Sequence, residues 1–136
     1  MRRVFLDTGA FLALLVAEDA NHPRAKELFG LASAEGWLLF TTNAVVVETY
    51  SVLLARARDG RRAAIAFLDA VLGDGYRVER VRRADEDRAI ALVRAHEDKT
   101  YSLCDALSFV VMERLGITDA IAFDRHFRAY GRFTIL

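Results

Sequence analysis

Three acidic residues of this chain stand alone inside apolar segments. They are Asp7 within residues 4–17, Glu48 within residues 38–55 and Asp105 within residues 100–112. Burial of an unpaired carboxylate is costly, and none of these segments contains a basic residue that could pair with it. Asp124 is a fourth acid of interest because it follows a short apolar run, residues 120–123. Hard carboxylate oxygens gathered at one place suit Mg²⁺ or Mn²⁺.

The neighbouring elements determine whether these acids can meet. Residues 3–6 and 120–123 read as strands, so Asp7 and Asp124 both follow strands and can lie at the carboxyl edge of a parallel sheet. Glu48 falls within a predicted helix, one turn from Val45 and Val52, on its core side. Asp105 lies in the first turn of a helix opened by Ser102, with Ser108 on the same face. We therefore expect four carboxylates to converge and to share a divalent cation.

Each acid also has a structural interpretation. Asp7 and Asp124 could cap the segments that follow them. Ser102 and Asp105 match a capping box, which would make Asp105 a helix-stabilising acid. A mid-helix glutamate such as Glu48 is the hardest to explain by structure alone. We interpret His126 as a turn residue and Cys104 as a small buried side chain.

Short apolar strands alternate with helical segments along the whole chain, which predicts an α/β fold. The expected strands are 3–6, 37–40, 77–81, 120–123 and 133–136, and the expected helices are 11–17, 23–36, 44–58, 60–73, 84–96 and 102–116. Uninterrupted apolar strands are typical of a parallel sheet covered on both faces. No linker or repeat divides the chain, so we expect residues 1–136 to form a single domain.

The composition excludes several classes of protein. With 54% hydrophobic residues, 28% charged residues and one proline, the chain is neither disordered nor collagen-like. Nineteen basic residues balance nineteen acidic ones, so no global positive field attracts nucleic acid or a membrane. One cysteine excludes an internal disulfide framework. Asp7 interrupts the apolar N-terminal run and no cleavage site is evident, so we expect a cytoplasmic protein without a membrane partner.

The four acidic motifs together resemble a PIN domain. They are FLDTGAF with Asp7, the isolated Glu48, SLCDALSFVVMERLGI with Asp105 and AIAFDRHF with Asp124. Their order and spacing, with the tail GRFTIL, are similar to VapC-type ribonuclease toxins over essentially the whole chain. The resemblance implies a three-layer α/β/α fold with a mostly parallel central sheet. It also implies a Mg²⁺- or Mn²⁺-dependent endoribonuclease that leaves a 5′-phosphate and a 3′-hydroxyl, is usually dimeric and is inhibited by a cognate antitoxin.

By position, Asp7, Glu48, Asp105 and Asp124 match the catalytic, metal-binding acids of the family. Thr8 and Ser108 match auxiliary hydroxyl positions. The chain departs from the family at Ala122, where a threonine or serine is common. For RNA binding we expect local arginines, either around one turn or near the site; they are Arg56, Arg58, Arg61, Arg62, Arg125, Arg128 and Arg132.

Other functions fit the sequence less well. An aspartyl-phosphate phosphotransferase calls for a second acid at position 9, which is glycine. A receiver-type signalling domain calls for a lysine after a late strand, and the chain has none beyond Lys99. A free-standing RNA-processing nuclease and a noncatalytic PIN-like binding module stay open as alternatives to a toxin. The RNA target is not encoded in any motif, because cleavage specificity depends on surface shape.

Overall fold

Five parallel strands form the centre of the protein. The computed structural model describes residues 1–136 and orders the strands β3-β2-β1-β4-β5, every neighbouring pair being parallel. The strands are β1 (Arg3–Leu6), β2 (Leu38–Thr42), β3 (Arg77–Glu79), β4 (Asp119–Ile121) and β5 (Thr134–Ile135). The predicted α/β class with a parallel sheet is confirmed.

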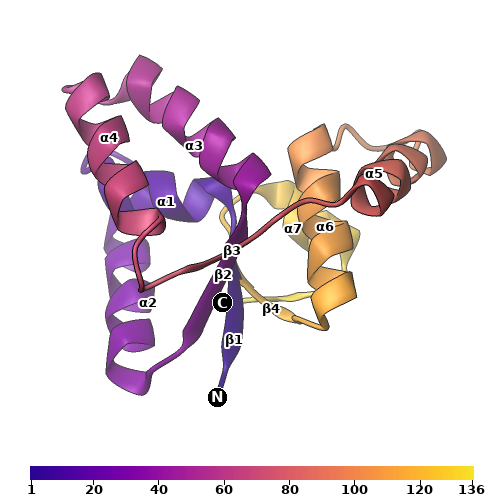
Figure 1. The fold of residues 1–136 in the computed structure, drawn as a ribbon, viewed down its shortest axis with the longest axis horizontal. Helices are drawn as coiled ribbons and strands as arrows, with labels where there is room; N and C mark the ends of the chain where they lie inside the picture. The colour runs from indigo at the N-terminus through magenta and orange to yellow at the C-terminus, as the bar shows by residue number, and fades with distance from the viewer.

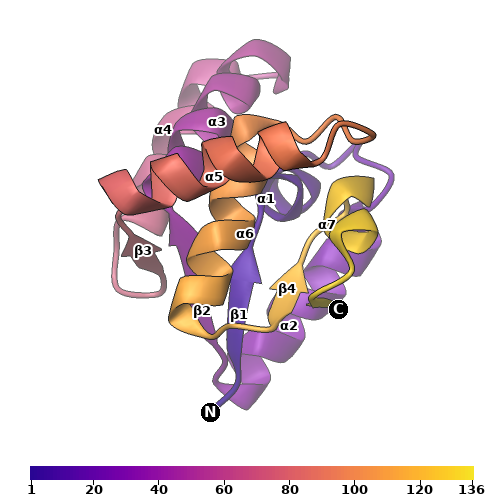
Figure 2. The same cartoon turned by 90° about the vertical axis from the view of Figure 1, so that its right-hand side faces the viewer.

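Seven helices surround the sheet. They are α1 (Thr8–Leu15), α2 (His22–Glu35), α3 (Asn43–Arg56), α4 (Gly60–Val71), α5 (Arg83–Ala95), α6 (Leu103–Leu115) and α7 (Arg125–Tyr130). Figure 1 shows α1 to α4 on one side of the sheet and α5 to α7 on the other. Figure 2 shows α6 lying across the sheet, with α5 packed outside it. This is the three-layer α/β/α arrangement expected from the sequence.

The central strand β1 is the most deeply buried part of the sheet. Val4, Phe5 and Leu6 are completely buried, because β2 and β4 flank this strand and helices cover both of its faces. Such a strand needs apolar side chains in both directions, which explains the uninterrupted apolar run in the sequence. The first residue after the run, Asp7, therefore emerges directly from the core.

The element boundaries differ from the expected ones in three informative places. Strand β2 continues two residues further, because Thr41 and Thr42 pair with β3. The Thr41 hydroxyl also donates to the Leu6 carbonyl at 2.9 Å, and the Thr42 hydroxyl accepts from the Val45 N–H and caps α3. Strand β4 ends at Ile121, two residues earlier than expected, so Asp124 follows a short connection rather than the strand itself. His126 was expected in a turn, but the segment Arg125–Tyr130 is a short helix, α7.

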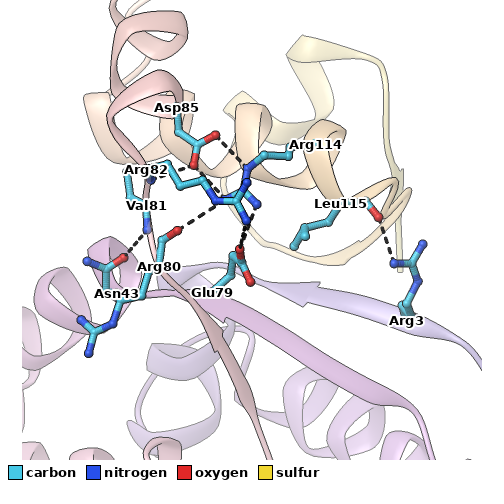
Figure 3. Close-up of polar contacts among 9 residues, drawn as sticks. All are labelled: Arg3, Asn43, Glu79, Arg80, Val81, Arg82, Asp85, Arg114 and Leu115. Atoms are coloured by element: carbon cyan, nitrogen blue, oxygen red, sulfur yellow. Dashed lines mark hydrogen bonds and ion pairs between the residues drawn. The ribbon is translucent and has the colours of Figure 1, made fainter.

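A charged network joins α5, α6 and β3. Arg114, on the last turn of α6, donates to both oxygens of Asp85 at 2.9 and 2.8 Å and to Glu79 at 2.8 Å (Figure 3). Asp85 also accepts from the backbone N–H of Arg82 at the start of α5. A bidentate arginine–carboxylate pair of this kind combines charge with fixed geometry. The network therefore holds the outer helix α5 against α6.

None of the helices is both long enough and apolar enough to cross a lipid bilayer.

Candidate active site

The central strands bring Asp7 and Asp124 to one edge of the sheet. Asp7 lies between the end of β1 and the start of α1, and its backbone N–H donates to the Ile121 carbonyl at the end of β4. Asp124 comes three residues after Ile121 and precedes α7. Both residues thus lie beyond the carboxyl ends of adjacent parallel strands, where α/β folds place their sites.

Two helices supply the remaining acids. Glu48 is half-buried on α3, which leaves the carboxyl end of β2, and Asp105 lies in the first turn of α6. An open pocket of about 370 Å³ is lined by Asp7, Glu48 and Asp124 together with Thr8 and Arg56. Three of the four acids predicted to converge thus lie around a single depression, and Asp105 is near enough for its charge to act on Asp7.

The pKa of Asp7 is raised by burial and by the other three acids. Asp7 is only 3% exposed. Burial raises its pKa from 3.8 to about 7, against the effect of the neighbouring Thr8 N–H, and the negative charges of Asp105, Glu48 and Asp124 raise it further. One carboxyl thus responds to all three other acids. The side chain makes no capping hydrogen bond to α1, so the capping interpretation of Asp7 is wrong.

Asp105 does cap its helix and also belongs to the acidic group. Its backbone N–H donates to the Ser102 hydroxyl at 3.0 Å, and its Oδ2 accepts from the Ser102 N–H at 3.1 Å. This is the predicted capping box. Burial nevertheless raises the pKa of Asp105, and the charge of Asp124 adds to the rise, so capping does not neutralise the influence of its neighbours. The capping and site interpretations are compatible.

Asp124 likewise serves two purposes. Its Oδ1 accepts from the backbone N–H of His126 at 2.8 Å and caps α7. One ligand atom each of Asp105, Asp124 and His126 lie within 4.8 Å of one another. His126 thus lies beside two of the predicted acids, in a short helix and not in the turn expected from the sequence. A signal for it existed, since it is two residues from Asp124, but spacing alone did not show that α7 folds back on α6.

The two auxiliary hydroxyls are both buried without a partner. Neither Thr8 Oγ1, beside Asp7, nor Ser108 Oγ, one turn after Asp105, makes a hydrogen bond. A buried hydroxyl without a partner is unusual in a folded protein. Thr8 also lines the acidic pocket.

The donor set fits a divalent cation. Most of the polar groups at the site are carboxylate oxygens. No arginine or lysine forms an ion pair with any of the four acids. The Thr8 hydroxyl, which has no hydrogen-bond partner, is a further oxygen beside Asp7. Clustered carboxylates without basic partners favour binding of Mg²⁺ or Mn²⁺, which take oxygen ligands. Burial and then the charges of the three other acids raise the pKa of Asp7, so its ionised form is unfavourable without a cation.

Cys104 lies closer to the acids than expected. The thiol is half-buried, and burial followed by the charges of Glu48, Asp7 and Asp105 raises its pKa far above the ordinary value. A thiol held in its protonated form is a poor nucleophile. Cys104 was expected to be a small buried side chain, and it is half-buried and close enough to the acids for their charges to act on its thiol.

The arginines separate into three groups. Arg56 lines the acidic pocket. Arg61 and Arg62 border a different hollow with Asp59 and Asp69, about 500 Å³ in volume. The other arginines named from the sequence are exposed or paired; they are Arg58, Arg125, Arg128 and Arg132. Of the predicted RNA contacts, only Arg56 lines the pocket of Asp7, Glu48 and Asp124.

Two further pocket residues had no signal in the sequence. Asp19 and Asn21 lie in the connection between α1 and α2 and line the same pocket. Asp19 Oδ1 accepts from the Asn21 backbone N–H at 2.8 Å, which fixes this connection. Polar residues in a loop are ordinary, so only the folded structure shows that they border the site.

Comparisons with known proteins agree with this architecture. The chain matches the PIN domain family over residues 4–132. It is 38% identical over 128 residues to the 23S rRNA-specific endonuclease VapC20 of Mycobacterium tuberculosis, covering 94% of each chain. It is 26% identical to Ribonuclease VapC26 of the same organism, covering 98% of this chain and 99% of that protein.

Solved structures give the same result. The crystal structure of M. tuberculosis VapC20, described as a Sarcin-Ricin loop cleaving toxin, superposes with a TM-score of 0.88 at 36% identity over 97% of this chain and 98% of that one. VapBC2 from Rickettsia felis, bound to a DNA fragment from its promoter, superposes with a TM-score of 0.72 at 12% identity over 98% of this chain and 97% of that one. At that identity, the second likeness concerns the fold alone.

Proposed function

The chain belongs to the PIN domain family, and from this we propose that it is a divalent-metal-dependent endoribonuclease and the toxin of a VapBC-type pair. The observation that carries the proposal is the convergence of Asp7, Glu48, Asp105 and Asp124 without a basic partner. A relative with 38% identity over 94% of the chain is a 23S rRNA-specific endonuclease, which supports RNA as the substrate. We treat residues 1–136 as one nuclease domain.

In this proposal the four acids hold one or two Mg²⁺ or Mn²⁺ ions. A bound divalent cation polarises the phosphodiester, lowers the pKa of a water molecule and stabilises charge on the leaving oxygen. Asp7, Glu48 and Asp124 reach the pocket from the end of β1, from α3 and from the β4–α7 connection, and Asp105 on α6 lies beside Asp124. Water would be the nucleophile: its oxygen joins the phosphorus, the bond between phosphorus and the 3′ oxygen breaks, and the leaving 3′ oxygen takes up the proton that the water gives up. The products would then be a 5′-phosphate and a 3′-hydroxyl.

The other residues of the pocket position the RNA. Arg56 supplies a positive charge beside four negative ones, which suits contact with a phosphate next to the scissile bond. The Thr8 hydroxyl has no protein partner and lines the same pocket, where it can donate to a phosphate oxygen or to bound water. Arg58, Arg61, Arg62, Arg125 and Arg128 are proposed as weaker backbone contacts.

A hairpin RNA with the sequence of the 23S rRNA sarcin–ricin loop is the first substrate to test, because one relative is described as cleaving that loop. We expect a single cut in the loop with Mg²⁺ or Mn²⁺, none with EDTA, and recovery when the cation is added back in excess. A matched hairpin with a scrambled loop and an Asp7→Asn preparation are the controls. Undiminished cleavage in EDTA by wild-type protein, with an inactive Asp7→Asn preparation, would contradict the metal mechanism.

The partners follow from the same proposal. We infer a small antitoxin protein, a homodimer and a cytoplasmic location. Exposed apolar side chains support protein contacts, since Val47 and Leu54 on α3 are 65% and 47% exposed. Light scattering of the purified chain tests the dimer. A gene for a small DNA-binding protein beside that of this chain would favour the toxin over a free-standing nuclease.

A further inference from the structure

His126 is the histidine of this chain whose ring is left without a hydrogen bond. His22 and His96 each place Nδ1 2.8 Å from a backbone carbonyl, that of Ala13 and that of Leu92. The hydrogen bond of His126 uses its backbone N–H, which donates to Asp124, while neither ring nitrogen has a partner. The imidazole is half-buried, so this freedom does not arise from full exposure to water.

The ring is nevertheless held in place. It packs edge-on against Tyr101, with the ring centroids 5.5 Å apart and the planes at 87°. Tyr101 is itself buried, and its ring stacks edge-to-face on Phe109 at 5.3 Å. Aromatic contacts of this geometry orient a side chain as well as bury it. The position of the His126 imidazole is thus fixed by packing.

Two carboxylates present unused oxygens to this ring. Asp105 is only 6% exposed and commits Oδ2 to the Ser102 N–H, while Oδ1 has no hydrogen-bond partner. Asp124 commits Oδ1 to the His126 N–H, and its Oδ2 has no hydrogen-bond partner. One ligand atom from each of the three side chains lies within 4.8 Å of the others. No ion pair joins His126 to either carboxylate, so the three groups surround a space instead of closing on one another.

We propose that Asp105, Asp124 and His126 form a second divalent-cation site, with a nitrogen ligand, that prefers Mn²⁺ over Mg²⁺. Imidazole binds transition metals more readily than Mg²⁺, whereas the carboxylates accept both. Asp124 belongs to this group and also lines the pocket of Asp7 and Glu48, so the two sites share it. The inference rests on the proposed metal-dependent function and adds to it a ligand, His126, and a metal preference.

Mn²⁺ itself is the probe that tests this site. Pulsed electron paramagnetic resonance of the Mn²⁺-loaded protein detects an imidazole ligand as ¹⁴N modulation of the echo. We expect this modulation in the wild-type chain and its loss in His126→Gln. Calorimetric titration should show Mn²⁺ affinity reduced about tenfold or more in His126→Gln, with a much smaller change for Mg²⁺.

The matched control carries the substitutions His22→Gln and His96→Gln together, which leave His126 as the only histidine. This variant should keep the ¹⁴N modulation, and it decides the question even where His126→Gln fails to fold. Bound Mn²⁺ without ¹⁴N modulation in the wild-type chain, or modulation that persists in folded His126→Gln, overturns the second site and leaves the proposed function intact. Absence of Mn²⁺ and Mg²⁺ binding altogether would overturn both.

Discussion

Asp7 is the residue where burial and like charge act most strongly together. Its carboxyl is almost fully buried, its pKa is raised to about 7, and three other acids contribute to the rise. Between the unfolded pKa of 3.8 and the folded pKa of about 7, the folded chain binds more protons than the unfolded chain. This group therefore lowers the free energy of unfolding as the pH rises across that interval.

Replacement of Asp7 by asparagine removes this pH-dependent cost. In EDTA at pH 8, Asp7→Asn should be more stable than the wild-type chain by roughly 2–4 kcal/mol, and the difference should shrink toward pH 4. Urea unfolding across this pH range measures the effect. Cleavage should be lost at every pH. A variant less stable than wild type at pH 8 would mean that the Asp7 carboxylate has a stabilising partner in the metal-free protein.

For Asp105, one substitution can distinguish the helix-capping role from the proposed metal-binding role. An asparagine at this position keeps an oxygen that can accept from the Ser102 N–H, so the capping box survives largely intact. We expect Asp105→Asn to melt within a few degrees of the wild-type chain in EDTA and to lose cleavage of the hairpin RNA. Loss of its charge also removes an anionic ligand, so Mg²⁺ should stabilise the variant less.

The matched variant for this prediction is Ser102→Ala, which removes the capping hydroxyl and keeps the carboxylate. It should lose about 0.5–2 kcal/mol of stability and retain cleavage. Retained cleavage in Asp105→Asn, with a loss of stability equal to that of Ser102→Ala, would make Asp105 a capping residue only.

At the scale of elements, local sequence patterns identified what each segment does alone. Single acids in apolar segments predicted buried carboxylates, and the alternation of strands with helices predicted a parallel sheet. Together these patterns led us to expect Asp7, Glu48 and Asp105 beside one another. Contacts between distant segments left no such pattern. His126 reaches Asp105 only because α7 folds back on α6, and Asp19 borders the pocket only because the α1–α2 connection turns toward it.

The ion-pair network of α5 and α6 is another long-range feature without a local signal. Asp85 and Arg114 are 29 residues apart in sequence, yet the Asp85 side chain is 2% exposed in the pair. Burial alone would raise the pKa of Asp85, but hydrogen bonds from Arg114 and the Arg82 N–H hold it below its ordinary value. The stability that this group contributes is present above its unfolded pKa and is lost as the pH falls through the lowered folded pKa.

Removal of Arg114 should therefore destabilise the fold strongly. Arg114→Met leaves Asp85 buried without its cation, which costs about 3–5 kcal/mol near neutral pH. The double variant Arg114→Met with Asp85→Asn should recover much of this loss, because asparagine is neutral and can still accept from the Arg82 N–H. A double-mutant cycle in urea measures the coupling. Equal stability of the double variant and Arg114→Met would show that the unpaired charge is not the cause.

At the scale of the whole molecule, the charges of the chain balance, but acidic residues gather at the pocket. Nineteen basic and nineteen acidic residues cancel, so no general positive field draws RNA to the protein. The pocket itself is acidic, with Arg56 as its basic lining residue. An RNA phosphate would be repelled from such a pocket until a cation reverses its charge. Metal binding is therefore expected to precede productive RNA binding.

The same charge distribution predicts how metal binding depends on pH. Asp7 with a pKa of about 7 is largely protonated at pH 5.5 and must lose its proton before it can ligate a cation. Mg²⁺ should therefore raise the melting temperature much more at pH 8 than at pH 5.5, with about 2.7 kcal/mol of added stability at a hundredfold excess over Kd.

Thermal melts of the wild-type chain with Mg²⁺, at constant ionic strength and at both pH values, measure this linkage. Asp7→Asn is the matched control: with no titrating group at that position, its smaller Mg²⁺ response should vary less between the two pH values. The two conditions should give opposite trends. Without metal, ionisation of Asp7 lowers the free energy of unfolding as the pH rises; with Mg²⁺, the same ionisation allows the ion to bind and raises it. An equal Mg²⁺ response of the wild-type chain at pH 5.5 and pH 8 would show that Asp7 does not ligate the ion.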